Sequence, residues 1–145
     1  MSKLRAVLVA IVALAIVVTG CSRSSDTTTT SVAGSSSEDV VFGQGELPAT
    51  IPTGFPLPEG SAIGSTMVVT KTGLTEVVIR VGTDQGAAAD YFNQALSQAG
   101  FTVDKSEANG ERWLIEFSDA SARGTIEISK AASGISDAVV RYNVP

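Results

Sequence analysis

Cys21 is the residue whose surroundings point most clearly to a chemical reaction. It is the only cysteine, and the chain contains no histidine, so a Ser-His or Cys-His catalytic pair is excluded. The cysteine directly follows Thr19 and Gly20, which come after an uncharged apolar run over 6–18 that ends in Val18. This position indicates covalent modification of the Cys21 sulfur rather than catalysis by it.

The first twenty residues have the three parts of an export signal. Lys3 and Arg5 supply positive charge, the apolar run 6–18 follows, and small residues end it. The run has thirteen residues, whereas a membrane-spanning helix needs about 20. We therefore predict a signal peptide over 1–20 that is removed before Cys21.

The stretch Val18-Thr19-Gly20-Cys21 resembles the bacterial lipobox, in which an aliphatic residue, a small residue and Gly or Ala precede the cysteine. The resemblance implies diacylglycerol on the Cys21 sulfur and cleavage between Gly20 and Cys21; acylation of the new amine is left open. Two or more acyl chains anchor a protein stably where one does so only marginally. We expect the mature chain to be held in the lipid bilayer by acyl chains on Cys21, on the extracytoplasmic face of the cell membrane.

Residues 21–39 form a predicted tether between this anchor and the folded domain. Eleven of the eighteen residues in Ser22–Asp39 are Ser or Thr, and only Val32 and Ala33 are apolar. Such a segment cannot bury enough surface to offset the entropy lost on folding. We predict a disordered tether with an r.m.s. span of about 23 Å, and leave its O-glycosylation open.

Charge and motif content argue against several functions. The net charge of −5 becomes −7 once the two basic residues of the signal are removed, and phosphate contacts need basic surface, so no nucleic-acid partner is expected. Motifs for a serine nucleophile or a calcium loop do not occur. We therefore expect no catalytic residue, no metal and no cofactor.

The segment 40–60 combines four prolines with large apolar residues. Proline excludes a helix or a central strand here, yet the segment is too apolar for a free linker. We predict an extended strap that packs on the domain through Phe55 and Leu57. A polyproline-type docking peptide is the alternative.

Residues 61–145 have the patterning of a small α+β domain. Period-2 alternation predicts six strands, near 66–70, 76–81, 101–105, 112–117, 125–130 and 139–144. One amphipathic helix is predicted from Gln85 to Ala99, with Thr83 or Asp84 as its N-cap and Gly100 after its end. Asn109-Gly110 predicts a hairpin, with a loop longer than two residues, and 118–124 and 131–137 are expected to be loops. The predicted fold is a two-layer α+β sandwich, ββαββββ, with an antiparallel sheet of about six short strands and the helix packed on one face.

The same alternation predicts a polar outward face on the sheet. Its candidate docking residues are Arg80, Arg112, Leu114, Glu116 and Arg141. Arginines around an apolar centre suit contact with a partner; the alternative is a solvated face with cross-strand ion pairs. Trp113 is expected to fill the core, with a ligand platform as the alternative.

Three short features resemble small envelope lipoproteins of actinobacteria. They are the run Phe55-Pro56-Leu57-Pro58-Glu59-Gly60, the helix end Ala99-Gly100-Phe101, and the Ser/Thr-rich tether behind the lipobox. The resemblance implies fold and location, and carries over no catalytic residue.

Three classes of function are therefore left open. A non-enzymatic module that binds an envelope protein or a wall component fits the tether, the lipid and the lack of catalytic groups. A carrier of a small apolar ligand between helix and sheet is the second. The third is a hydrolase using tyrosines or paired carboxylates, which would have to lie about 5–10 Å apart in a cleft; the candidates are Glu107, Glu111, Glu116, Glu127, Tyr91 and Tyr142.

Replacing the predicted lipid attachment site should release the protein. In the Cys21→Ala variant we expect the chain to move from the membrane fraction to the soluble fraction, because the acyl chains are its only predicted anchor. The measurement is immunoblotting of fractionated cells. Retention of Cys21→Ala in the membrane fraction would contradict the lipobox prediction.

Overall fold

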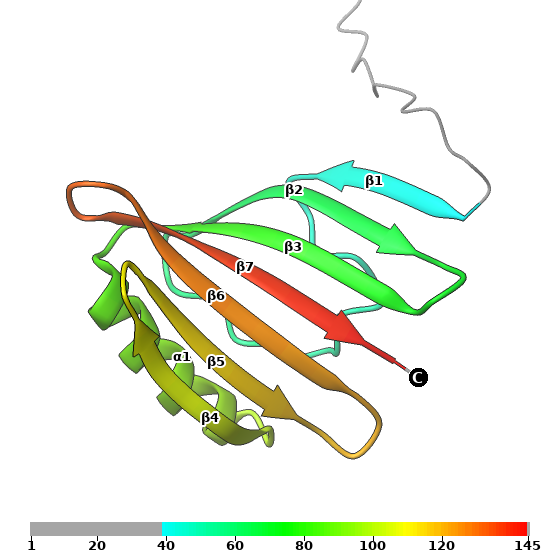
Figure 1. Cartoon of the computed structure of the whole chain (residues 1–145). Coiled ribbons are helices and arrows are strands. Elements are labelled where there is room, and N and C mark those ends of the chain that lie inside the picture. Colours follow the sequence, from blue (N-terminus) through cyan, green and yellow to red (C-terminus); the bar gives the residue numbers. More distant parts are fainter. Residues whose placement is uncertain (1–38, 145) are drawn as a thin grey trace, which may run out of the picture. The chain divides into compact units, whose positions relative to one another are not determined.

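The structure, a computed structural model, describes residues 39–144, which form seven strands and one helix (Figure 1). The predicted signal, Cys21 and nearly all of the predicted tether lie outside these residues. The elements are β1 (Val40–Gln44), β2 (Ala62–Val69), β3 (Leu74–Val81), α1 (Gln85–Gln98), β4 (Thr102–Asn109), β5 (Arg112–Ser118), β6 (Arg123–Ala132) and β7 (Ile135–Asn143).

All seven strands belong to one antiparallel sheet with the order β1-β2-β3-β7-β6-β5-β4. The helix α1 follows β3 and carries the chain to the far edge, and the next four strands return one beside the other until β7 pairs with β3. In Figure 1, α1 lies behind the β4–β5 end of the sheet. The predicted α+β class is confirmed, with seven strands instead of about six.

The additional strand, β1, comes from the start of the segment predicted to be a strap. Val40–Gln44 precedes all the prolines and pairs with β2 at the edge of the sheet, because three consecutive apolar residues favour an extended, half-covered position. The remainder of the segment does pack on the core. Ile51 and Phe55 are buried there, and Leu57 is partly buried against the same cluster.

Alternating apolar residues of four adjacent strands build the core. Their side chains face α1 and the strap, and each is no more than 2% exposed: Val77, Ile79, Val81, Ile115, Phe117, Ile126, Ile128, Ala138, Val140 and Tyr142. Burying a large apolar side chain is worth about 1.5–3 kcal/mol. We call this side of the sheet the inner face.

The ends of α1 are set by local capping. The Asp84 carboxylate accepts a hydrogen bond from the Ala87 backbone N–H at 3.0 Å, which satisfies a free donor of the first turn. At the other end, Gly100 has φ 90° and the Phe101 N–H donates to the Leu96 carbonyl at 3.0 Å, as in a Schellman cap. Phe101 is thereby turned back into the core, where it is 8% exposed.

Phe117 is the residue at which the sheet, the helix end and the strap meet. Its ring centroid lies 5.5 Å from that of Phe101, 5.9 Å from Phe55 and 6.2 Å from Tyr142. Gly124 is the direct cross-strand neighbour of Phe117 and also of Tyr142. A Cβ at Gly124 would lie 2.3 Å from Phe117 Cζ, so the ring occupies the space that a side chain would take.

Three sequence predictions about loops are wrong. Gly124, expected in a loop, lies in β6. The predicted loop 131–137 is shorter, because β6 runs to Ala132 and β7 begins at Ile135. Asn109 pairs with Arg112, so the hairpin turn has only two residues between the strands. The two strands extend beyond their apolar residues, because β4 is exposed and its backbone can continue to pair without apolar side chains.

A methyl group at Gly124 should destabilise the fold. We expect Gly124→Ala to lower the free energy of unfolding by about 1–3 kcal/mol, because Phe117 must leave its position. Gly82→Ala is the matched control, since a Cβ there meets no atom within 4 Å, and should change stability by no more than about 0.5 kcal/mol. Denaturant unfolding measures both; equal effects would contradict the proposed contact.

Candidate functional site

The face of the sheet opposite α1 is covered by no other element among residues 39–144 (Figure 1). We call it the outer face. Its residues alternate in sequence with the buried core residues and are half-buried or exposed: Glu76, Val78, Arg80, Arg112, Leu114, Glu116, Thr125, Glu127, Asp137, Val139 and Arg141.

Three cross-strand ion pairs fix the arginines of this face. Arg80 holds Asp137 with two hydrogen bonds of 2.9 and 3.1 Å. The other two pairs are Arg112–Glu127 at 2.6 Å and Arg141–Glu76 at 2.8 Å. The hydrogen bond and the charge of Asp137 raise the pKa of Arg80. Exposed pairs of this kind add little to stability because solvent screens them, so they orient side chains more than they stabilise the fold.

One row of the outer face runs across all seven strands. Directly opposed residues in the successive strands are Phe42, Met67, Glu76, Arg141, Thr125, Glu116 and Lys105. We call these seven residues the central row. The row changes from apolar at β1 to charged at β7 and β4, so the face has an apolar end and a polar end.

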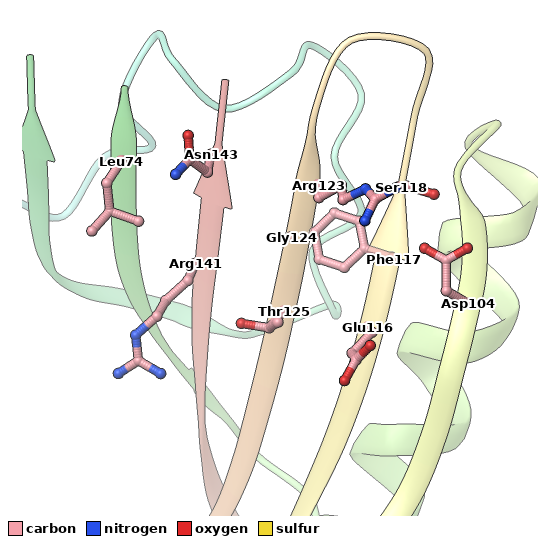
Figure 2. Close-up of a pocket in the computed structure, with 10 residues that line it drawn as sticks. All are labelled: Leu74, Asp104, Glu116, Phe117, Ser118, Arg123, Gly124, Thr125, Arg141 and Asn143. Atoms are coloured by element: carbon pink, nitrogen blue, oxygen red, sulfur yellow. The ribbon is translucent and has the colours of Figure 1, made fainter. Parts of the chain in front are cut away.

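A shallow hollow of about 450 Å³ lies at the polar end, beside the central row (Figure 2). Its lining residues come from β3, β7, β6, β5 and β4: Leu74, Asp104, Glu116, Phe117, Ser118, Arg123, Gly124, Thr125, Arg141 and Asn143. Figure 2 shows Thr125 between Arg141 and Glu116. The hollow thus lies next to Gly124 and Phe117, which are both buried.

The chemistry of the hollow is that of a polar contact site. It offers two cations, Arg123 and Arg141, and two carboxylates, Asp104 and Glu116. Its hydroxyl groups have no histidine to activate them, because the chain contains none. Mixed charges of this kind suit hydrogen bonds to a polar partner better than they suit an apolar ligand.

The structure places all five candidate docking residues on the outer face. Glu116 and Arg141 border the hollow. Leu114 lies opposite Glu127, and Arg112 and Arg80 lie one row further along the strands. The predicted cross-strand ion pairs are present for all three arginines, whereas contact with a partner stays a prediction.

The carboxylates considered for catalysis have structural partners or lie apart. Glu107 pairs with Lys105 at 2.7 Å, and its hydrogen bond raises the pKa of that lysine. Glu127 is held by Arg112. Glu111 lies in the two-residue turn and is exposed. Glu116, the fourth candidate, borders the hollow together with Asp104.

The aromatic candidates also have structural contacts. The Tyr91 hydroxyl donates to the Leu57 carbonyl at 2.7 Å and ties α1 to the strap. Trp113 is partly buried against the core, and its Nε1–H donates to Ser106 Oγ at 2.9 Å. The Tyr142 hydroxyl, buried at the inner face, donates to Asp119 at 2.6 Å. These contacts assign the three side chains to the fold.

Asp119 is a residue that the sequence interpretation missed. In the β5–β6 loop its Oδ1 accepts hydrogen bonds from the Ser121 and Ala122 backbone N–H groups, at 2.7 and 2.8 Å, while Oδ2 accepts from Tyr142. The bond from Tyr142 and the backbone donors lower the pKa of Asp119 to about 2. Burial, and then the hydrogen bond to Asp119, raise the pKa of Tyr142. The only sign of this residue in the sequence was an Asp two residues before a small polar residue, and this pattern is common in turns.

Two further searches concern the described part of the chain alone. No helix within residues 39–144 is long and apolar enough to cross a membrane. The same residues contain no group of three or more acidic, histidine or cysteine side chains placed to hold a metal ion.

Comparison with known proteins gives no relative from which a function could be carried over. No protein-family model, no curated protein and no solved structure matches the chain. Its likeness to actinobacterial envelope lipoproteins thus stays a prediction from short motifs.

Loss of the Asp119 carboxylate should appear in the pH dependence of stability. Its folded-state pKa of about 2 lies below the ordinary value of 3.8, so its contribution is present above about pH 4 and is lost as the pH falls through about 2. We expect unfolding free energy to fall less over this interval in Asp119→Asn, which keeps the oxygen that caps the loop but does not titrate. Parallel pH profiles for the two proteins would contradict this.

Proposed function

We propose that this protein is a lipid-anchored binding module on the extracytoplasmic side of the cell membrane, without enzymatic activity. Its anchor is the lipid on Cys21, and its binding surface is the outer face. The partner is a protein or wall component of the cell envelope. The Val18–Cys21 motif supports the location.

The proposed binding role rests on the observation that other elements cover only one face of the sheet. The helix and the strap pack on the inner face, and the outer face is left open across the full width of the sheet. Strands paired on both sides form a rigid support, and the ion pairs hold the arginines in position. A rigid, pre-organised surface loses little entropy on binding.

The ion pairs also indicate the chemistry of the partner. The side chains of Arg80 and Arg112 are 63% and 66% exposed, whereas those of their partners Asp137 and Glu127 are only 26% and 31% exposed. In these two pairs the arginine is therefore the more accessible side chain, although the chain is acidic overall. Guanidinium groups recognise carboxylate oxygens in a planar, two-bond geometry, so we infer a partner with acidic or carbonyl-rich surface.

The two alternative functions have weaker support. A carrier needs apolar space between helix and sheet, but this interior is filled by side chains such as Phe92, Leu96 and Phe117, each no more than 1% exposed. A hydrolase of the kind considered needs two carboxylates in a cleft, whereas Glu107 and Glu127 are paired with Lys105 and Arg112.

Site-specific photo-crosslinking in living cells tests the binding surface. A photoreactive amino acid at Leu114, on the outer face of β5 between Arg112 and Glu116 of the hollow, should give a covalent adduct with a partner. The same amino acid at Gln94, which is exposed on α1, is the matched control and should give none. An adduct at Gln94 but not at Leu114 would contradict the proposed surface.

Charge reversal should remove the adduct without unfolding the protein. In the double variant Arg80→Glu plus Arg112→Glu we expect the Leu114 adduct to fall about tenfold or more, because exposed arginines are frequent binding hot spots. Arg80→Gln plus Arg112→Gln controls for loss of the ion pairs without repulsion. An undiminished adduct in the charge-reversed protein would reject the arginine surface.

A further inference from the structure

The edge strand β1 is the most exposed apolar element of residues 39–144. Val41 is 55% exposed and Phe42 is 63% exposed, and these are two of the three exposed large hydrophobic residues in that range. They lie on opposite faces of the strand, since Phe42 is opposite Met67 and Val41 is opposite Val68. Neither face of β1 is fully covered, and one of its two edges has no neighbouring strand.

The hydrogen bonds at the two ends of β1 show which groups face this open edge. The Asp39 carbonyl accepts from the Thr70 N–H at 2.9 Å, and the Gly45 N–H donates to the Gly64 carbonyl at 3.1 Å. In an antiparallel pair such residues alternate with residues that point the other way. The N–H and C=O groups of Val40, Phe42 and Gln44 are therefore directed to the open edge.

The two edges of the sheet differ in how they oppose further pairing. β4, at the opposite edge, carries the charged residues Asp104, Lys105 and Glu107 and a register shift between Val103 and Lys105. Charges and irregularities are the usual devices that keep an edge strand from pairing with another chain. β1 has the sequence VVFGQ and a regular register throughout, so its edge is open to pairing.

We propose that β1 pairs with β1 of a second copy of this chain, antiparallel and centred on Phe42. Phe42 of one copy then lies opposite Phe42 of the other, and Val40 lies opposite Gln44. These are the residues whose backbone groups face the open edge, so each opposed pair can exchange two hydrogen bonds. The seven-stranded sheets of the two copies would join into one.

The strand is self-complementary, which is why a second copy is the preferred occupant. It carries no charge that its own copy would repel, and aromatic residues opposed across strands are favourable pairs. The two-fold axis is perpendicular to the sheet, because opposed side chains share a face. Both outer faces thus point the same way, and Phe42 and Met67 of each copy form one apolar patch on that side.

This inference does not depend on the proposed function. It adds to that function, because two outer faces on one side would give a partner two contact surfaces and raise its avidity. An extended peptide of another protein and residues 21–38 of the same chain are the competing occupants of the edge, and the experiment must separate them from a second copy.

Disulfide cross-linking of the full-length chain in detergent micelles tests the register. Phe42→Cys should form a disulfide-linked dimer on mild oxidation, because the two cysteines are directly opposed. Val40→Cys alone and Gln44→Cys alone should not, since like positions are four residues apart, about 13 Å, beyond the reach of a disulfide. A mixture of these two variants should again give the dimer. The unaltered chain is the control for Cys21.

A charge at the two-fold centre tests the pairing without a cross-link. By native mass spectrometry and sedimentation of the full chain in micelles, we expect a dimer for the wild type. Phe42→Lys should weaken it about tenfold or more, because two like charges would be directly opposed. Val41→Lys is the matched control: it adds the same charge at a neighbouring exposed position that faces Gly43 of the other copy, and should weaken the dimer less.

Three results would overturn the proposal. The first is a wild-type chain that stays monomeric at all concentrations, with no Phe42→Cys dimer. The second is a disulfide from Phe42→Cys only to Cys21 of the same chain or to a different protein. The third is a dimer that Phe42→Lys leaves unchanged. The photo-crosslink at Leu114 is independent of all three, so failure of the pairing and failure of the proposed function are distinguishable.

Discussion

The contact between the Phe117 ring and the bare backbone of Gly124 holds the layers of this domain together. Because Gly124 has no side chain, the ring can lie flat enough to stack on Tyr142 and still meet Phe55 of the strap and Phe101 at the helix end. Four segments of the chain, namely the strap, the helix end, β5 and β7, thus share one aromatic cluster. The strap is part of the core, and the hydrogen bond from Tyr91 to its backbone fixes the same arrangement from the helix side.

One short helix cannot cover seven strands, and this explains why the two faces of the sheet differ. The inner face is completed by the strap and carries the burial that stabilises the fold. The outer face does not have to be buried for the fold to be stable, and its polar groups are arranged by pairing across strands. Net stability owes little to these pairs, so their value lies in the fixed display of Arg80, Arg112 and Arg141.

Features that depend on the periodicity of apolar residues could be predicted from the sequence. Strand pairing that depends on the backbone alone could not. The helix and the inward positions of strands such as β3 follow from 3.6- and 2-residue repeats. Capping preferences gave Gly100 and two N-cap candidates, Thr83 and Asp84, of which Asp84 is the cap. All five candidate residues could be placed on one face for the same reason. β1 was missed because nearby prolines outweighed a short apolar run, and Gly124 because a glycine that admits an aromatic ring looks like a loop glycine. The hollow and Asp119 arise from register, which no single strand encodes.

The position of β1 has a mechanical consequence. In a copy that is anchored as proposed and whose β1 is not paired with a second copy, tension from the membrane would enter the sheet at Val40, the first residue of a five-residue strand that then has β2 as its one neighbour. A pull directed away from β2 would break the bonds between the two strands one after another from that end. Release of β1 would add about 17 Å of free chain at ~3.4 Å per residue, while the aromatic cluster around Phe117 stays closed. Under an applied force, the tether could then lengthen before any part of the core is disturbed.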